Sequence, residues 1–477
     1  MRRIIIFNTI LFFFISINLF AQDGLGDEKA GFSVSIGGEA SASFVGYIDD
    51  FSKGADYTRL GEIFTGKLNF SAETRIAKAV VNLNLSTTVL PINIDEAYVQ
   101  GFFGKFDITA GMRKIIWGKA DNMGPLDVIN PLDSTQIFTE MSDKISLLDI
   151  KIARPLVSTV FRFGDFSKLE AVFVPNFKPH HIAQAGEKWA DSRINTLAEM
   201  PPVEITLPFL GPFTIPIKVN LEEPDTRAIS YAQAGLRFTT TVGSADIGAQ
   251  YYYGRLHEPA IEDWNFDIYY NTSGILPLPE GVLATASYKY NPFHQIGIDY
   301  AQDLRGFNTR MELAANITED LSGDDGTVYN PSIAWSVGFD RELFWGINLN
   351  LQVNESIRLL QSKLGEDINL LPDRIKNDPL GVSNYIHEYD IEGGQPITTT
   401  RITAALTKKF IRDELELRAA VAWGIEDMDC AILPALIWTK DDIRLALSGG
   451  FFLGNSKGQL GQHKDSNFIK ISFKYKF

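Results

Sequence analysis

The chain has 477 residues, with 44 lysines and arginines against 59 aspartates and glutamates, a formal net charge of −15 and one cysteine, Cys430. An acidic chain without a basic stripe cannot neutralise phosphates, which argues against nucleic-acid binding. A single cysteine excludes an internal disulfide, and a mean hydropathy close to zero fits a chain in which apolar and polar residues alternate.

The N-terminus predicts a secretory signal peptide. Two arginines precede an apolar run over residues 4–20, and the small residue Ala21 offers a cleavage point. A membrane anchor is the alternative, but the run falls short of about 20 clean apolar residues. No cysteine lies near Ala21, which argues against a lipoprotein. We therefore expect residues 1–22 to be removed on export and residues 23–477 to form one unit.

Beyond residue 30 the chain consists of short segments in which apolar and polar residues alternate. Clear examples are residues 67–72, 81–87, 307–317 and 415–423. One face of each segment is compatible with lipid and the other with water. A single segment of this kind would equally suit a strand of a soluble β-sandwich. Many such segments behind an export signal favour an all-β transmembrane antiparallel barrel.

Two kinds of connection separate these segments. The tight turns are predicted at residues 73–76, 103–105, 164–167, 242–244, 303–306, 341–346, 410–413 and 440–442. The longer loops are predicted at residues 48–58, 88–91, 118–146, 175–226, 256–292, 318–330, 361–397, 425–429 and 454–466. These connections predict 18 strands, with 16 also possible. Residues 282–290 are assigned to a loop, although they could form an extra strand.

Residues 106–133 contain the most distinctive motif of the chain. A strand over residues 106–116 runs into a segment rich in Asp, Asn, Gly and Pro. The pattern R-x-x-x-W-G followed by D-x-x-N-P resembles a family of bacterial porin-like outer-membrane proteins of unknown function. The matching residues are Arg113, Trp117, Gly118, Asp127, Asn130 and Pro131. The resemblance covers a small part of the chain and implies a class of barrel, with no particular substrate.

A long loop after the fifth strand is well placed to fold into the lumen and narrow it. The alternative is a plain outer loop in which Asp, Asn and Pro only form turns. Strand alternation adds charges that we expect to face the lumen, where they could tune ion preference or simply pair with one another. The candidates for a pore constriction are Arg113, Lys119, Asp121, Asp127, Asn130, Asp133, Arg162, Arg237, Arg310 and Glu312. Ion selectivity is left open.

Residues 200–217 are apolar and repeatedly interrupted by proline, which is unusual for a loop. Exposed apolar surface of this extent usually has a purpose, so the segment could capture a hydrophobic substrate. We favour a hairpin that lies against the barrel mouth or partly plugs it.

The last strand alternates apolar and polar residues up to the C-terminal aromatic residue. Phe473, Tyr475 and Phe477 lie on one face, and lysines such as Lys470 on the other. The strand resembles the C-terminal signal by which the barrel-assembly machinery recognises outer-membrane proteins. It must also pair with the first strand, because an open edge in lipid would leave backbone groups without hydrogen bonds.

Nothing in the sequence predicts an enzyme. The histidines lie in or beside predicted loops without a nucleophile motif, and the adjacent His180 and His181 are at best a weak metal site. We expect neither a cofactor nor a metal. The sequence predicts an outer-membrane channel for passive diffusion of small solutes, surrounded by membrane lipid and lipopolysaccharide or glycolipid. A hydrophobic-substrate transporter and a surface adhesin or structural protein are the alternatives, and the oligomeric state is left open.

Overall fold

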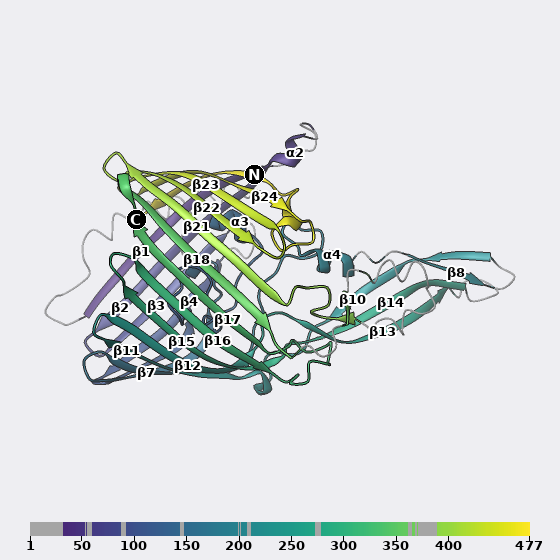
Figure 1. Cartoon of the computed structure of the whole chain (residues 1–477), viewed down its shortest axis with the longest axis horizontal. Helices are drawn as coiled ribbons and strands as arrows, with labels where there is room; N and C mark the ends of the chain where they lie inside the picture. Colours follow the sequence, from purple (N-terminus) through teal and green to yellow (C-terminus); the bar gives the residue numbers. More distant parts are fainter. Residues whose placement is uncertain are drawn as a thin grey trace.

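The computed structural model is a closed barrel of 18 antiparallel strands, which confirms the predicted fold (Figure 1). The structure describes residues 32–477 except 53, 55–59, 87–91, 144–146, 199, 201, 208–210, 272–277, 361–364, 368–369 and 371–388. The expected signal peptide at residues 1–22 lies outside the described residues.

Each barrel strand pairs with its neighbours in chain order, and the last strand pairs with the first to close the ring. The barrel strands are β1 (Phe32–Tyr47), β2 (Leu60–Thr74), β3 (Ala77–Ser86), β4 (Ile92–Phe103), β5 (Phe106–Arg113), β6 (Arg154–Phe163), β7 (Ser167–Val174), β11 (Gln233–Val242), β12 (Ala245–Arg255), β15 (Pro292–Asp303), β16 (Asn308–Thr318), β17 (Ser332–Glu342), β18 (Ile347–Arg358), β21 (Thr398–Phe410), β22 (Leu415–Gly424), β23 (Asp429–Lys440), β24 (Ile443–Gly454) and β25 (Phe468–Lys476). The predicted tight turns join strands at one end of the barrel, the short-turn end, and the predicted longer loops join them at the other, the long-loop end.

Strand alternation separates an apolar outer surface from a polar interior. In β15, Ile296 and Ile298 are 56% and 54% exposed, whereas Gln295 and Asp299, which flank them in the strand, are 0% and 3% exposed. The same alternation in β25 turns Ile471 and Phe473 outward and buries Lys470. Apolar residues cover the outside because lipid is the solvent there, and polar residues face a wet interior.

The seam of the barrel is closed by the C-terminal residue. The backbone amide of Gly38 donates to the Phe477 carbonyl at 2.9 Å, and the Phe477 amide donates to the Gly38 carbonyl at 3.0 Å. A Cβ atom on Gly38 would lie 2.6 Å from Cζ of the Phe477 ring. The ring therefore packs over the glycine, and Lys474 adds an ion pair to Glu39 at 3.0 Å across the seam.

An arm made of two long loops extends from the long-loop end (Figure 1). Its three-stranded sheet contains β10 (Ile217–Glu222), β14 (Leu278–Lys289) and β13 (Ala260–Asn271). The assignment of residues 282–290 to a loop is therefore wrong: most of them form β14, which lies in the arm and adds no strand to the barrel. Alternation alone cannot distinguish a membrane strand from one in water, because both bury one face.

The proline-rich segment is also placed differently from our prediction. It forms a hairpin of β8 (Val203–Leu207) and β9 (Gly211–Ile215), as expected, with residues 201 and 208–210 outside the described residues. The hairpin lies at the far end of the arm, away from the barrel mouth (Figure 1). It therefore neither plugs the mouth nor lies against it, because it extends the arm sheet outward.

Short helices lie at the long-loop end and in the interior, and one helical turn lies at the short-turn end. They are α2 (Ile48–Ser52), α3 (Ile137–Met141) and α4 (Ser192–Ala198), with single helical turns at residues 147–149, 229–231, 344–346 and 461–463 and a two-residue pairing of β19 (Glu366–Asp367) with β20 (Tyr389–Asp390). Among the described residues, no helix is both long and apolar enough to cross a membrane.

Candidate functional site

The connection between β5 and β6, residues 114–153, folds into the barrel, and we call it the inner loop. The strand before it ends at Arg113 rather than at residue 116. Its side chains and backbone bond to inward-facing residues on strands as distant as β16 and β25. The described part of the loop makes two excursions, a first lobe over residues 118–126 and a second lobe over residues 134–149.

Trp117 fixes the start of the inner loop. It is 1% exposed, and its indole Nε1 donates to Glu170 on β7 at 3.3 Å. A Cβ atom on Gly235 of β11 would lie 2.6 Å from the Trp117 ring, so only glycine leaves room for it there. Tyr252 packs edge-on at 6.2 Å between ring centroids. Trp117 thus anchors the loop to the wall formed by β7, β11 and β12.

The carboxylate of Glu312 on β16 holds the first lobe. It accepts hydrogen bonds from the backbone amides of Lys119, Ala120 (2.7 Å) and Leu126 (3.3 Å). Gly118, at φ +101°, provides the close approach, because a Cβ atom there would collide with the Glu312 carboxylate. Bonds from amides to a charged acceptor are stronger than neutral ones, so this single side chain organises a whole turn.

The rest of the first lobe bonds to β16 and to the nearby strand β18. Asp121 accepts from Arg310 Nη1 at 2.5 Å and from Asn350 Nδ2 at 2.8 Å. The amide of Asn122 donates to Gln352 Oε1 at 3.1 Å. Leu126, fully buried, fills the space beside Gly297, where a Cβ atom would collide with it. The lobe therefore lies on the inner faces of β15, β16 and β18.

Asp127 and Asn130 tie the inner loop to itself. The Asn130 side chain accepts from the Ile115 amide at 2.7 Å and donates to the Arg113 and Ile152 carbonyls at 3.1 and 2.9 Å. Asp127 is ion-paired with Lys151, whose side chain is 1% exposed. At the base of the loop, Asn130 is buried and the Asp127 side chain is 11% exposed, and this brace explains the D-x-x-N part of the motif.

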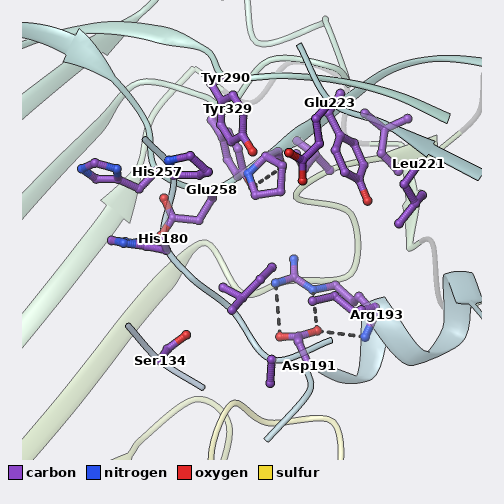
Figure 2. Close-up of a pocket in the computed structure, with 18 of the residues that line it drawn as sticks. Ser134, His180, Asp191, Arg193, Leu221, Glu223, His257, Glu258, Tyr290 and Tyr329 are labelled. Carbon is purple, nitrogen blue, oxygen red and sulfur yellow. Dashed lines mark hydrogen bonds and ion pairs between the residues drawn. The ribbon is translucent and has the colours of Figure 1, made fainter. Parts of the chain in front are cut away.

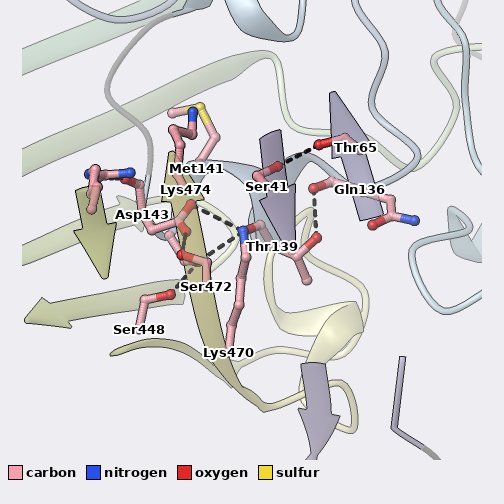
Figure 3. Close-up of polar contacts among 12 residues, drawn as sticks. Ser41, Thr65, Gln136, Thr139, Met141, Asp143, Ser448, Lys470, Ser472 and Lys474 are labelled. Atoms are coloured by element: carbon pink, nitrogen blue, oxygen red, sulfur yellow. Dashed lines mark hydrogen bonds and ion pairs between the residues drawn. The ribbon is translucent and has the colours of Figure 1, made fainter. Parts of the chain in front are cut away.

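The second lobe is held by the strands on the other side of the barrel, as Figure 3 shows. Asp143 accepts from Lys470 Nζ at 3.0 Å and from Ser472 Oγ at 2.6 Å, both on β25. Lys470 also donates to the Thr139 carbonyl at 2.8 Å. Arg418 of β22 donates to a backbone carbonyl of the lobe at 2.7 Å. Lys470, on the polar face of the last strand, thus binds this lobe.

The remaining candidate residues lie at separate depths of the barrel. Lys119 joins the first lobe and pairs with Asp246 at 3.4 Å, and the Arg113 guanidinium lies 5.0 Å from the centre of the Tyr98 ring. The other three lie elsewhere. Arg237 forms a buried pair with Asp299 at 2.6 Å, Arg162 pairs with Asp107 near the short-turn end, and Asp133 contacts His181 at 3.1 Å near the long-loop end.

The loop between β7 and β11 crosses the barrel mouth. Its Trp189 packs against Phe452 of β24 and Phe468 of β25, at ring distances of 5.4 and 6.0 Å. Phe138 of the inner loop packs on the same cluster. The β7–β11 loop thus rests on the second lobe and on the strands beside the seam.

Two stacked histidines join the inner loop to the β7–β11 and β12–β15 loops, which we call the mouth loops. The rings of His180 and His257 lie 4.6 Å apart, and His180 Nδ1 accepts from the Leu132 amide at 2.9 Å. Burial lowers the pKa of each to about 4, and for His257 the neighbouring His180 adds to the shift. Both are uncharged at neutral pH. The part of the chain that the structure describes contains no group of three His, Cys, Asp or Glu residues placed to hold a metal ion.

Sequence reasoning missed several of these partners. Gln352, Trp189 and His257 carry no local motif, because their contacts join residues far apart in the chain. A signal did exist in Gly235 and Gly297, which occupy inward positions of strands where a side chain would normally stand. Glycine within a strand often marks the close approach of another segment.

The fold and the interior together define a porin-like membrane-spanning barrel with a loop folded into its lumen. No protein-family model matches the chain, and neither does any curated protein. Among solved structures, it is similar to a BenF-like porin from Pseudomonas fluorescens Pf-5, with 7% identity and a TM-score of 0.47 over 93% of this chain and 98% of that one. Pseudomonas aeruginosa OccK3 (OpdO) gives 7% and 0.47 over 93% and 95%. Wzi, an outer-membrane carbohydrate-binding barrel of Escherichia coli, gives 11% and 0.42 over 97% and 87%.

Proposed function

We propose that this protein is an outer-membrane channel through which small polar solutes diffuse, and that the inner loop narrows its lumen. The apolar outer belt supports residence in a membrane, and the signal peptide expected at residues 1–22 supports export. By the usual orientation of such barrels, the long loops and the arm face outside and the short turns face the periplasm.

The observation that carries the proposal is the binding of the first lobe by Glu312. The lobe stays inside the barrel because the carboxylate of Glu312, on the inner face of β16, accepts three backbone hydrogen bonds. Such bonds to a charged group contribute about 1.5–3 kcal/mol each. The first lobe thereby occupies a fixed part of the lumen, and solutes pass beside it.

Conductance in planar lipid bilayers tests this function. We expect discrete open steps from the purified protein and larger steps from Glu312→Gln, because an amide cannot accept three amide hydrogen bonds as a carboxylate does. Glu342→Gln, an exposed carboxylate at the short-turn end, is the control and should conduct like the wild type. A folded barrel that remains silent in both the wild type and Glu312→Gln would contradict the proposal.

The arm favours a second candidate function, binding of a partner at the cell surface. It carries the apolar hairpin β8–β9 far from the lumen (Figure 1), which removes the support for a hydrophobic-substrate channel fed by that hairpin. Deleting residues 203–215 should leave conductance unchanged and should reduce adhesion of cells that display the protein. A changed conductance would show that the hairpin acts on the lumen after all.

A further inference from the structure

A cavity of about 1470 Å³ lies at the long-loop end, beyond the inner loop. Its wall comes from six connections: the inner loop and the loops β7–β11, β12–β15, β16–β17, β18–β21 and β24–β25. Ligand pockets in proteins usually enclose about 300–1,000 Å³, so the space is ample for a small organic molecule. A site assembled from so many loops holds its lining residues in one arrangement only when the loops pack together.

Acidic side chains dominate the charge of the cavity. Among the described residues that line it, one lysine and one arginine stand against eight carboxylates, namely Asp191, Glu223, Glu258, Glu262, Asp263, Asp324, Asp325 and Asp390. Arg193 is ion-paired with Asp191 at 3.1 Å, so these two charges largely cancel, and seven carboxylates remain against one lysine. The buried His180 and His257 are neutral at pH 7 because burial lowers the pKa of each to about 4. A cavity with this balance of charges attracts cations.

Tyrosine rings lie beside two of these carboxylates. Burial raises the pKa of Tyr288 to about 12, and the negative charge of the nearby Glu223 contributes; the pKa of Tyr290 is raised by the same two causes. Burial and the charge of Glu258 likewise raise the pKa of Tyr329, whose hydroxyl donates to the Pro259 carbonyl at 3.2 Å. Figure 2 shows both glutamates and both labelled tyrosines on one side of the cavity, across from the pair of Asp191 and Arg193.

We propose that this cavity is a binding site for small organic cations, held between the carboxylates of Glu223 and Glu258 and the tyrosine rings beside them. A cation over an aromatic face is attracted by the ring quadrupole, and a carboxylate supplies the opposite charge. An apolar portion of the ligand would pack on Trp189 and Ile194, which also line the cavity. Anions of the same size are repelled by the acidic lining.

The site takes its ligand at the long-loop end of the barrel, and binding there does not depend on whether the lumen conducts. Binding is therefore measured on the intact protein without a membrane potential. The probe is benzyltrimethylammonium, which combines a permanent charge with an aromatic ring, and the counter-probe is benzenesulfonate, of similar size and opposite charge. Titration calorimetry on the detergent-solubilised full chain reports both.

We expect the cation to bind and the anion not to bind, with cation affinity falling as salt is added, because the interaction is electrostatic. Glu223→Gln and Glu258→Gln should each weaken cation binding about three- to tenfold, and Tyr290→Leu by a similar factor. Glu342→Gln at the short-turn end is the matched control and should bind like the wild type. The gel mobility of unheated samples establishes that each variant is a folded barrel.

Three results would overturn the proposal. The first is equal binding of the two probes by the wild type. This comparison uses no variant, so a folding defect in a variant cannot affect it. The second is an unchanged cation affinity in folded Glu223→Gln and Glu258→Gln. The third is the absence of any cation binding at millimolar concentration by the folded wild type. A silent bilayer trace would count against the channel function and leave this site standing.

Discussion

Gly118 of the inner loop and Glu312 of β16 approach so closely that a single methyl group on Gly118 would collide with the Glu312 carboxylate. The glycine lies at φ +101°, a conformation that other residues rarely adopt. The W-G step of the motif therefore combines a buried anchor, Trp117, with the residue that lets the chain turn onto a charged side chain.

Gly118→Ala should displace the first lobe and raise single-channel conductance, because both the backbone conformation and the contact with Glu312 become unfavourable. Gly61→Ala is the control, since a Cβ atom there meets only ordinary contacts of 3.7–3.8 Å. Bilayer recordings of the two variants compare them directly. Equal conductance in both would show that the first lobe does not limit the flow.

Trp117→Ala should destabilise the barrel by about 3–5 kcal/mol, because it empties a packed space that Gly235 leaves open for the ring. Denaturant unfolding of the folded protein in micelles measures the loss. Trp345→Ala removes the same side chain from a site that is 78% exposed and should cost far less. Similar losses in the two variants would contradict the anchoring role.

Asp299→Asn should destabilise the barrel by about 3–5 kcal/mol, since it leaves the Arg237 guanidinium buried without its counter-charge. The pair is 2.6 Å apart, with side chains 6% and 0% exposed. Glu73→Gln breaks an exposed pair with Lys78 and should cost at most about 1 kcal/mol. Chemical unfolding midpoints of the two variants measure these losses. Equal losses would show that the buried pair stabilises the barrel no more than the exposed one.

Acid should loosen the mouth loops. His180 and His257 have pKa values of about 4 in the folded state against an ordinary 6.5, so the unfolded loops bind protons more readily. Their contribution to stability is complete above pH 6.5 and is lost as the pH falls toward 4, at about 1.4 kcal/mol per unit of pKa difference. Limited proteolysis between pH 7 and 4 should show increasing cleavage in the β7–β11 loop.

His180→Asn provides the test of that assignment. It should reduce the pH dependence of cleavage to the part that His257 contributes, whereas His181→Asn, at a side chain that is 55% exposed, should leave it unchanged. A pH dependence in His180→Asn as steep as in the wild type would assign the effect to other groups.

Gly38→Val should hinder closure of the barrel, because the added side chain would collide with the Lys67 carbonyl of β2 and with the Phe477 ring. The fraction of protein that migrates as folded barrel in unheated gels measures closure. Deletion of Phe477 should lower it as well, through loss of two backbone hydrogen bonds across the seam. Normal folding of both variants would show that Phe477 is not needed to close the barrel.

The barrel could be predicted from the sequence because apolar and polar residues alternate along each strand, with apolar residues toward lipid and polar residues toward water. Alternation along the strand is enough to place Ile296 on the outside and Asp299 on the inside. Residues 282–290 show the limit of that rule, since a strand of the arm alternates in the same way as a strand of the barrel wall. Only pairing partners, which lie outside the segment, separate the two cases.

The site was less accessible to sequence reasoning. The loop after the fifth strand could be expected to enter the lumen, and Lys119, Asp121, Arg310 and Glu312 do meet there. Yet the Lys119 amide and Glu312 are 193 positions apart, and no local pattern encodes such a bond. Asp127 and Asn130 looked like lining residues because they are polar, but the structure uses them to brace the loop.

The cluster around Trp189 ties the order of assembly to a spectroscopic signal. Its partners include Val45 of β1, Phe452 of β24 and Phe468 of β25, so they come together only when the first and last strands have met. We therefore expect Trp189 to reach its final packing only after both ends of the chain have joined. During refolding, the full burial of this indole should accompany completion of the ring.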